Sequence, residues 1–292
     1  MRRINLFSYG MMSLLKLFAR VLVIVLAVSL FQQAHSAQAV PVRPPHFDRR
    51  AMPEALAAPV RSPKGDAAKP APDWRFYVLE YHNFTENASQ AADYTMTVSA
   101  LRRDLDFLRD NGYTTVLPRE LAAGQLDDGS PLPQKAVLLT FDDGYEDNYT
   151  TMFPILKEKG AAATIFLITD LIGTPGYMTE AQIKEMAASG IVRFGCHTKS
   201  HNDLSSLNEE EVRSQLNVSA DIIENMLGYE VKALAYPAGG FNDTVVRVAG
   251  ERFAFAYTTK SPASYAADNM LTIPRYAVYR GYGASFITGT LS

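Results

Sequence analysis

The stretch 137–145 (VLLTFDDGY) constrains this chain most, because an apolar run ends there in two adjacent carboxylates and a glycine. The run 137–139 indicates a strand buried on both faces, which is typical of a parallel sheet in an α/β protein. Asp142 and Asp143 then lie at the carboxyl end of that strand, where α/β folds place their chemistry. Neighbouring strand residues point to opposite sides, so one aspartate can bind a metal while the other acts as a base. The alternative interpretation of Asp-Asp-Gly is an ordinary turn.

A second polar cluster, FGCHTKSH at 194–201, also follows a short apolar segment and carries two of the five histidines. His197 and His201 are four residues apart, and two imidazoles at that spacing on one turn can meet a single cation. A carboxylate would complete the three-ligand set of a catalytic zinc site, with one position open for water. The two clusters together predict a metal site at the end of the sheet.

Strand-like and helix-like segments alternate from residue 73 to residue 292. One example is the helix expected to start at Asn208, with Glu211 completing a capping box and a buried stripe following. Such alternation predicts a parallel sheet, and the roughly 220 residues of 73–292 suffice for one domain with a substantial core. The single cysteine, Cys196, cannot form an internal disulfide. We expect it to be a small buried hydrophobe, with a nucleophile or metal ligand as the alternative.

The motifs that carry a family resemblance are TFDDGY (140–145), HTKSH (197–201), AYPAGG (235–240), LEYHNF (79–84) and IPRY (273–276). The first three resemble, in order and spacing, the first three motifs of the polysaccharide deacetylases, metal-dependent enzymes that share the nodulation-factor deacetylase domain. The other two resemble the branch that acts on poly-β-1,6-N-acetylglucosamine and similar exported polymers. The resemblance implies a distorted (β/α) barrel with about seven strands, which removes N-acetyl groups from an exported or cell-surface polysaccharide.

The resemblance also implies roles for single residues. By match to the family, Asp143, His197 and His201 hold the metal, and Asp142 is the base that takes a proton from water. The backbone N–H of Tyr236 is expected to share the oxyanion with the metal. On composition alone, Tyr236-Pro237 and the residues after it would be a simple turn.

The general acid departs from the commonest family pattern, because this chain has no histidine after His201. In the poly-N-acetylglucosamine branch an early histidine fills this role, and His82 matches it. The alternative role of His82 is to cap the end of the first strand. For the basic residue that usually precedes the third motif, Lys232 is the only nearby candidate. We expect Arg275 to take its place beside Asp142.

The expected cofactor is a divalent metal, zinc by default, since imidazole and carboxylate also accept cobalt, nickel or iron. Two histidines and one aspartate are also the ligand set of non-haem iron oxygenases, which are a rival interpretation. Those sites usually lie in antiparallel barrels, whereas this chain alternates helix and strand. A non-catalytic polysaccharide-binding module on a degenerate deacetylase fold is the second rival.

The formal charge is −3, and −7 without the four basic residues of the first 39. An acidic protein is a poor candidate for binding nucleic acid or an anionic membrane surface, since phosphate contacts come from clustered lysine and arginine. The charge suits a neutral polymer whose product becomes cationic. The expected partner is an N-acetylated polysaccharide.

The N-terminal part differs from the rest in composition. Residues 1–39 combine basic residues, no acid, the apolar run 21–31 and the site Ala-Gln-Ala at 37–39, which predicts a secretory signal peptide. An uncleaved membrane anchor is the alternative, because 11–17 is also apolar. Residues 40–72 hold eight of the sixteen prolines without periodicity, which predicts a linker.

We therefore expect export to the periplasm, the cell surface or the medium, and membrane contact only through an uncleaved signal. No second, glycoside-hydrolase-like domain of the kind found in some relatives is expected after Ser292.

Overall fold

The structure is a computed structural model that describes residues 75–260 and 269–278. All described residues lie within one compact unit, Gly65–Ser292. The signal peptide and linker predicted at 1–39 and 40–72 therefore lie outside the described residues. Within the described part, no helix combines the length and the apolar character needed to cross a membrane.

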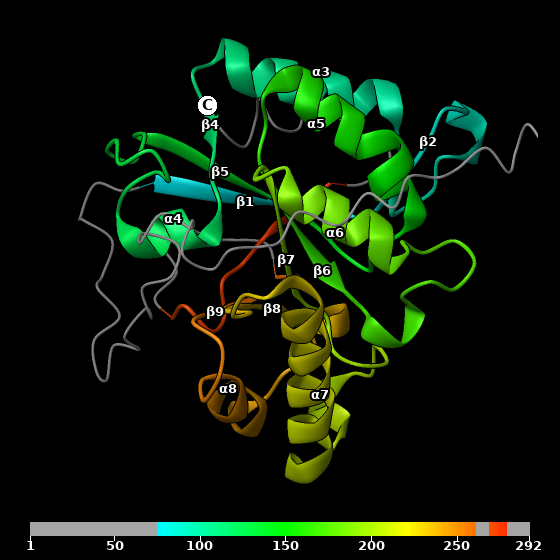
Figure 1. Ribbon diagram of the computed structural model, residues 1–292, viewed down its shortest axis with the longest axis vertical. Helices are drawn as coiled ribbons and strands as arrows, with labels where there is room; N and C mark the ends of the chain where they lie inside the picture. The colour runs from blue at the N-terminus through cyan, green and yellow to red at the C-terminus, as the bar shows by residue number, and fades with distance from the viewer. Residues whose placement is uncertain (1–74, 261–268, 279–292) are drawn as a thin grey trace, which may run out of the picture. The chain divides into compact units, whose positions relative to one another are not determined.

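A parallel sheet organises this unit (Figure 1). Its strand order is β10, β1, β5, β6, β7, β8, β9, and the short β4 also pairs with β5. The strands are β1 (Arg75–Tyr81), β4 (Thr114–Thr115), β5 (Lys135–Phe141), β6 (Ala163–Leu167), β7 (Val192–Cys196), β8 (Ala233–Ala235), β9 (Phe255–Tyr257) and β10 (Tyr276–Ala277). A separate pair is formed by β2 (Asn83–Thr85) and β3 (Thr95–Thr97). The predicted parallel α/β architecture with about seven strands is confirmed.

Helices connect the strands, as a parallel sheet requires. The α-helices are α3 (Val98–Asp110), α4 (Pro118–Ala123), α5 (Phe153–Lys159), α6 (Glu180–Ala188), α7 (Glu209–Leu227) and α8 (Asp243–Ala249). The predicted start of α7 is confirmed, because the Asn208 side chain accepts from the N–H of Glu211 and the Glu211 side chain reaches back to the N–H of Asn208. The helical segment after β5 begins with a π-helical turn, η2 (Asn148–Met152), which leads into α5.

The segment 269–278 brings the two edges of the sheet together. Ile273 forms a parallel bridge with Tyr257 of β9. A few residues later, Tyr276 and Ala277 form β10, which pairs with β1 at the other edge. The sheet is thereby curled into a distorted barrel, and Arg275 lies at the point of closure.

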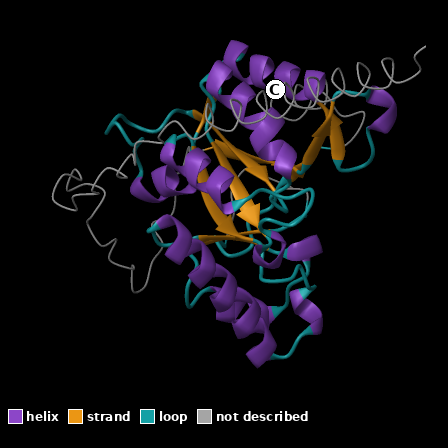
Figure 2. Ribbon diagram, turned by 45° about the vertical axis from the view of Figure 1, so that its right-hand side comes forward, coloured by secondary structure: helices purple, strands orange, loops and turns teal. Residues whose placement is uncertain are grey.

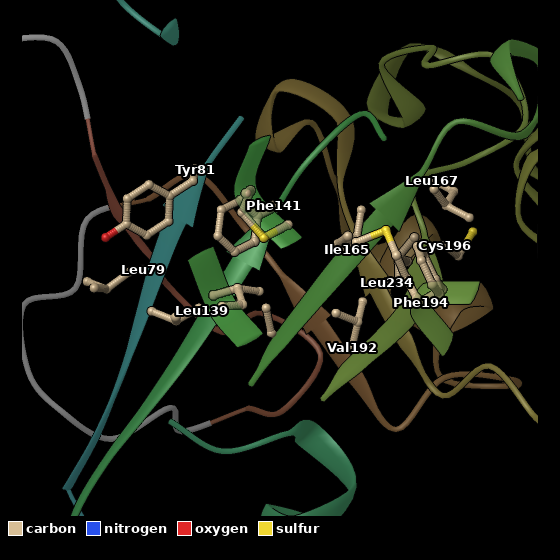
Figure 3. Close-up of a cluster of buried hydrophobic side chains, with 14 of the residues drawn as sticks. Leu79, Tyr81, Leu139, Phe141, Ile165, Leu167, Val192, Phe194, Cys196 and Leu234 are labelled. Atoms are coloured by element: carbon tan, nitrogen blue, oxygen red, sulfur yellow. The ribbon is translucent and has the colours of Figure 1, made fainter. Parts of the chain in front are cut away.

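Alternate residues of the strands belong to two different apolar clusters. In β1, Phe76 and Val78 belong to the smaller cluster, whose buried members come from strands and loops and from none of the α-helices. This cluster fills the inside of the curled sheet. Leu79 and Tyr81 belong to the larger cluster, which also contains buried residues of α3, α5, α6, α7 and α8. Figure 2 shows helices around the sheet. Figure 3 shows side chains of the larger cluster that come from the strands.

A polar pair interrupts the larger cluster. The Tyr81 hydroxyl donates to Asp104 Oδ2 on α3 at 3.3 Å, and both side chains are fully buried. The other oxygen, Asp104 Oδ1, is buried without a partner among the described residues. Burial raises the pKa of Asp104 from 3.8 to about 7, although the Tyr81 hydrogen bond opposes the shift. Between these two values the folded protein holds a proton here that the unfolded chain has released.

We therefore expect the stability of the wild type to fall as the pH rises from about 4 to about 7, by up to about 4 kcal/mol from this group. The Asp104→Asn variant lacks this titration, so the melting temperature of the variant relative to that of the wild type should rise between pH 5 and pH 8. Thermal unfolding across that range measures the difference. Asp106→Asn on the same helix is the control, because the hydrogen bond with Lys159 lowers the pKa of Asp106. Asp106 is therefore ionised between pH 5 and pH 8 in both the folded and the unfolded protein. Parallel curves for Asp104→Asn and the wild type would contradict a raised pKa.

Candidate active site

The residues predicted for the site meet at the carboxyl ends of the strands. Asp142 and Asp143 follow β5, His197 follows β7 and His82 follows β1. Arg275 comes just before β10, whose first residue pairs with β1 near the carboxyl end of that strand. The carboxyl ends of parallel strands lie at one edge of a sheet, so segments far apart in sequence come into contact there.

The two histidines of the second motif lie on an irregular loop rather than on a helical turn. Thr198 and His201 have left-handed backbones, with φ of 67° and 59°. Gln215 of α7 fixes the loop, because its Oε1 accepts from the N–H groups of Lys199 and Ser200. The imidazole rings come to 4.9 Å between centroids.

His197 is buried and has a defined tautomer. Its Nδ1 donates to the carbonyl oxygen of Ala235 at 2.8 Å. In the neutral ring the lone pair is therefore on Nε2, the nitrogen that faces Asp143. The side chain of His201 is 40% exposed, which opens the site to solvent on that side.

Asp143 lies between the two imidazoles. Its Oδ1 is 3.4 Å from His197 Nε2 and 3.4 Å from His201 Nε2. The backbone at Asp143 is left-handed, with φ of 74°, and this turns its side chain out of the alternation of β5. Asp143 Oδ1 is buried and has no hydrogen-bond partner among the described residues. A buried carboxylate oxygen without a donor indicates that a cation belongs there.

Asp142 is paired with Arg275, the arginine that we expected beside it. Arg275 Nη1 donates to Oδ1 at 2.8 Å and Nη2 donates to Oδ2 at 2.7 Å, and the arginine side chain is fully buried. Its Nε donates to the carbonyl oxygen of Thr258, and Nη1 also reaches Thr140 Oγ1. Burial would raise the pKa of Asp142, but the charge of the Arg275 guanidinium and its hydrogen bonds outweigh burial and hold this pKa well below 3.8. Asp142 is therefore ionised at neutral pH.

Glu80 is a site residue that the sequence analysis missed. It is almost fully buried in β1, with Oε2 at 3.4 Å from Arg275 Nε and Oε1 at 3.9 Å from His82 Nε2. Burial raises the pKa of Glu80 to about 7, against the effect of Arg275. Strand alternation could have revealed it. Glu80 is on the same face of β1 as Phe76 and Val78, which point to the inside of the curled sheet.

His82 lies next to this cluster, with its side chain 15% exposed. Its position is held from η2, because Asn148 Nδ2 donates to the carbonyl oxygen of His82 at 2.9 Å. Burial lowers the pKa of His82 below 6.5, and the carboxylates of Asp142 and Asp143 only partly oppose this. The ligand atoms of Glu80, His82 and Asp142 lie within 4.8 Å of one another, but Arg275 already supplies the cation there.

The predicted role of Tyr236 is wrong. Its backbone N–H donates to the carbonyl oxygen of Tyr257 at 3.0 Å, because the pairing of β8 with β9 continues one residue past the strand. Its side chain is fully buried and its hydroxyl donates to the carbonyl oxygen of Leu271. Tyr236 is thus a core residue, and its N–H is not available to an oxyanion. The sequence motif alone does not show where strand pairing stops.

The N–H group of Ala238, two residues after Tyr236, makes no such hydrogen bond with a described strand. Pro237 has none, Gly239 and Gly240 donate theirs to carbonyl oxygens, and the N–H of Ala238 has no partner among the described residues. Ala238 is exposed and has a left-handed backbone, with φ of 52°.

Comparison with known proteins agrees with this arrangement. The family profile of the polysaccharide deacetylases matches residues 129–252. The Bacillus subtilis protein YxkH, which is named as a polysaccharide deacetylase, is 31% identical over 267 residues, covering 89% of this chain and 91% of YxkH. The chain belongs to the polysaccharide deacetylase family.

Two further likenesses cover smaller or more distant parts of this deacetylase. The poly-β-1,6-N-acetyl-D-glucosamine N-deacetylase of Escherichia coli is 33% identical over 147 residues. This match covers 45% of this chain and 22% of that protein. Among solved structures, the Streptococcus pyogenes deacetylase PplD in complex with acetate superposes with a TM-score of 0.67 and 27% identity, over 75% of this chain and 98% of that one. The distorted (β/α) barrel implied by the family resemblance is confirmed.

The deacetylase fits a divalent metal at Asp143, His197 and His201. Ligand atoms bound at about 2.1 Å in tetrahedral geometry lie about 3.4 Å apart, and Asp143 Oδ1 lies 3.4 Å from each imidazole Nε2. The bond from His197 Nδ1 to the Ala235 carbonyl is the outer contact that orients a metal-binding histidine. The donor set suits zinc, cobalt, nickel and iron.

We expect the two aspartates to respond differently to metal. Zinc added to metal-stripped wild type at about 100 times its dissociation constant should stabilise the fold by about 2.7 kcal/mol and raise the melting temperature. Asp143→Asn should lose most of that rise. Asp142→Asn should start from a lower melting temperature, because Arg275 loses its partner, and should keep the rise.

Calorimetry with and without zinc, and metal content after dialysis, measure both effects. Lys199→Gln in the histidine loop, whose side chain forms a surface ion pair with Asp170, is the control and should keep the rise. Equal loss of metal in both aspartate variants would show that the division between ligand and free carboxylate is wrong.

Proposed function

We propose that this deacetylase is a metal-dependent hydrolase that removes N-acetyl groups from an exported N-acetylhexosamine polymer, with poly-β-1,6-N-acetylglucosamine as the first candidate and zinc as the first candidate metal. The observation that carries the proposal is the unpartnered Asp143 Oδ1, 3.4 Å from two imidazoles and next to an ionised carboxylate. An amide is a poor electrophile with a poor leaving group, so its hydrolysis needs an activated water, an oxyanion partner and an acid. The site offers a candidate for each.

The first requirement is a base that is ionised and in place. A divalent metal held by Asp143, His197 and His201 would polarise the acetyl carbonyl and make water acidic enough to be activated. Asp142 accepts the proton of the attacking water. Its Oδ2 is the suitable atom, because it lies 3.9 Å from His197 Nε2 and therefore faces the metal ligands. The hydrogen bonds from Arg275 keep this carboxylate in position without blocking all of its lone pairs.

The second requirement is a donor for the oxyanion that forms as water adds to the carbonyl. With Tyr236 excluded, the N–H of Ala238 is the donor that the turn after β8 offers. A backbone donor at a fixed, left-handed residue needs no rearrangement during the reaction, and one such donor contributes about 10²–10³ in rate.

The third requirement is an acid for the departing nitrogen. His82 is adjacent to Asp142, and its proton would go to the sugar nitrogen as the C–N bond breaks and acetate is released. The products are acetate and a free amine on the polymer. Since burial lowers the pKa of His82, the protonated form is lost as the pH rises, and the amide reaction should slow on the basic side.

The substrate assignment is supported by the LEYHNF stretch that places His82, and by the likeness of 45% of this chain to the Escherichia coli poly-β-1,6-N-acetyl-D-glucosamine N-deacetylase. Export is part of the same proposal and is supported by the composition of residues 1–39. An iron oxygenase is disfavoured because the sheet is parallel and the chain belongs to a hydrolase family. A binding module without activity would not need an ionised Asp142 beside the metal ligands.

Purified protein loaded with zinc should release acetate from poly-β-1,6-N-acetylglucosamine oligomers faster than from chitin or peptidoglycan fragments. The mass of each oligomer after incubation counts the acetyl groups lost, and chelation should stop the reaction. Asp142→Asn is the matched control, and the loss of a general base should slow turnover by about 10²–10⁴. Iron-dependent oxygen consumption would support the oxygenase, and binding of oligomers without any loss of mass would support the binding module.

The role of His82 predicts a difference between amide and ester substrates. A nitrophenyl acetate has a leaving group that needs little protonation, so His82→Ala should lose far more activity on N-acetylglucosamine oligomers than on this ester. The variant should also lose the basic limb of the kcat profile on the amide and should bind zinc normally. Equal losses on both substrates, with the basic limb unchanged, would mean that His82 only supports the end of β1.

A further inference from the structure

An exposed aromatic ring lies directly beside the candidate acid. Among the described residues, three large hydrophobic side chains are exposed: Tyr94 at 50%, and Val218 and Ile222 at 37% each. The last two are on the outer helix α7, where single apolar residues at the surface need no explanation. Tyr94 differs, because its ring centroid is 4.6 Å from that of His82.

The exposure of Tyr94 does not come from a loose segment. The carbonyl oxygen of Tyr94 accepts from the N–H of Asn83 at 3.4 Å, and the residues after it form β3, which pairs with β2. The neighbouring side chains Phe84 and Met96 are buried at 8% and 3% exposure. The backbone at Tyr94 is thus held in place, while half of the residue's surface is open to solvent.

The contacts place Tyr94 at one end of a series that starts at the metal ligands. Asp142 Oδ2 is 3.9 Å from His197 Nε2, the ligand atoms of Asp142 and His82 lie within 4.8 Å, and the ring of Tyr94 follows His82. The proposed chemistry runs along the same series, since the acetyl carbonyl would meet the metal ligands and the nitrogen would meet His82. The sugar ring that carries this nitrogen comes next, beside Tyr94.

We infer that Tyr94 forms a sugar-binding subsite, in which its ring stacks on the hexosamine that carries the reacting N-acetyl group. This inference rests on the proposed function. A β-linked hexosamine has mostly equatorial substituents, so its ring faces consist of C–H groups and are apolar. The face of an aromatic ring carries partial negative charge and attracts such C–H groups. The 54° angle between the Tyr94 and His82 rings shows that they are not stacked face to face.

The subsite makes a specific kinetic prediction. Stacking is made equally in the ground state and in the transition state, so its loss should raise KM and leave kcat nearly unchanged. For Tyr94→Ala we expect KM for a β-1,6-linked N-acetylglucosamine pentasaccharide to rise on the order of tenfold, which corresponds to about 1.4 kcal/mol. Tyr94→Phe keeps the ring and should restore most of the wild-type KM. Nitrophenyl acetate has no sugar, so the loss on it should be much smaller.

The controls separate this role from others. Ile222→Ala removes a comparably exposed apolar side chain on α7 and should leave both reactions unchanged, and calorimetry shows whether each variant is folded. A fall in kcat on pentasaccharide and ester alike would overturn the subsite, because Tyr94 would then act by positioning His82. A Tyr94→Ala variant with the wild-type KM on the pentasaccharide would overturn the subsite and leave the proposed function standing. A wild type that releases no acetate from any oligomer would overturn both.

Discussion

The contact between Arg275 and Asp142 is the interaction on which the rest of the structure depends. Arg275 lies in the segment 269–278 that joins β9 to β1, so the arginine that closes the barrel is also the one that holds the base. Breaking a buried ion pair by removing one partner typically costs 3–5 kcal/mol, because the other charge is left uncompensated. The closure of the sheet and the ionisation of Asp142 are therefore coupled. The ring of Phe166, 6.0 Å from the guanidinium carbon, lies under this pair, and Gly195 has no Cβ where that ring packs.

Backbone strain is concentrated at the same edge of the sheet. The described residues include four non-glycine residues with positive φ: Asp143, Thr198, His201 and Ala238. Each follows a strand within a few residues, and each such conformation costs about 1–3 kcal/mol. The surroundings hold them in place, as when the Thr198 hydroxyl accepts from the N–H of His201 at 3.0 Å. At Asp143 the left-handed turn separates two adjacent aspartates, so that one faces Arg275 and the other faces the imidazoles.

Much of this could be predicted from the sequence, because apolar runs and turn residues are local signals. The buried strand before Asp142 and the capping box of α7 are examples. The position of Arg275, 133 residues from Asp142, followed only from a family resemblance. Tyr236 was assigned wrongly because its N–H is used by a strand that pairs with β8, which its own motif does not reveal. Glu80 was missed because Arg275 reaches it only through the closure of the sheet, which no pattern within β1 shows.

The charges of the site explain why it can exist over an apolar interior. Asp142, Asp143 and Glu80 are three buried carboxylates, and Arg275 supplies one positive charge to them. With all three ionised, this group carries a net charge of about −2, which is costly in a low-dielectric surrounding. When no metal ion is bound, a proton on Glu80 reduces this charge, and burial raises the pKa of Glu80 to about 7. A divalent ion at Asp143 would balance the remaining charge and favour the ionised form of Glu80. The third carboxylate thus ties metal binding to the proton balance beside His82.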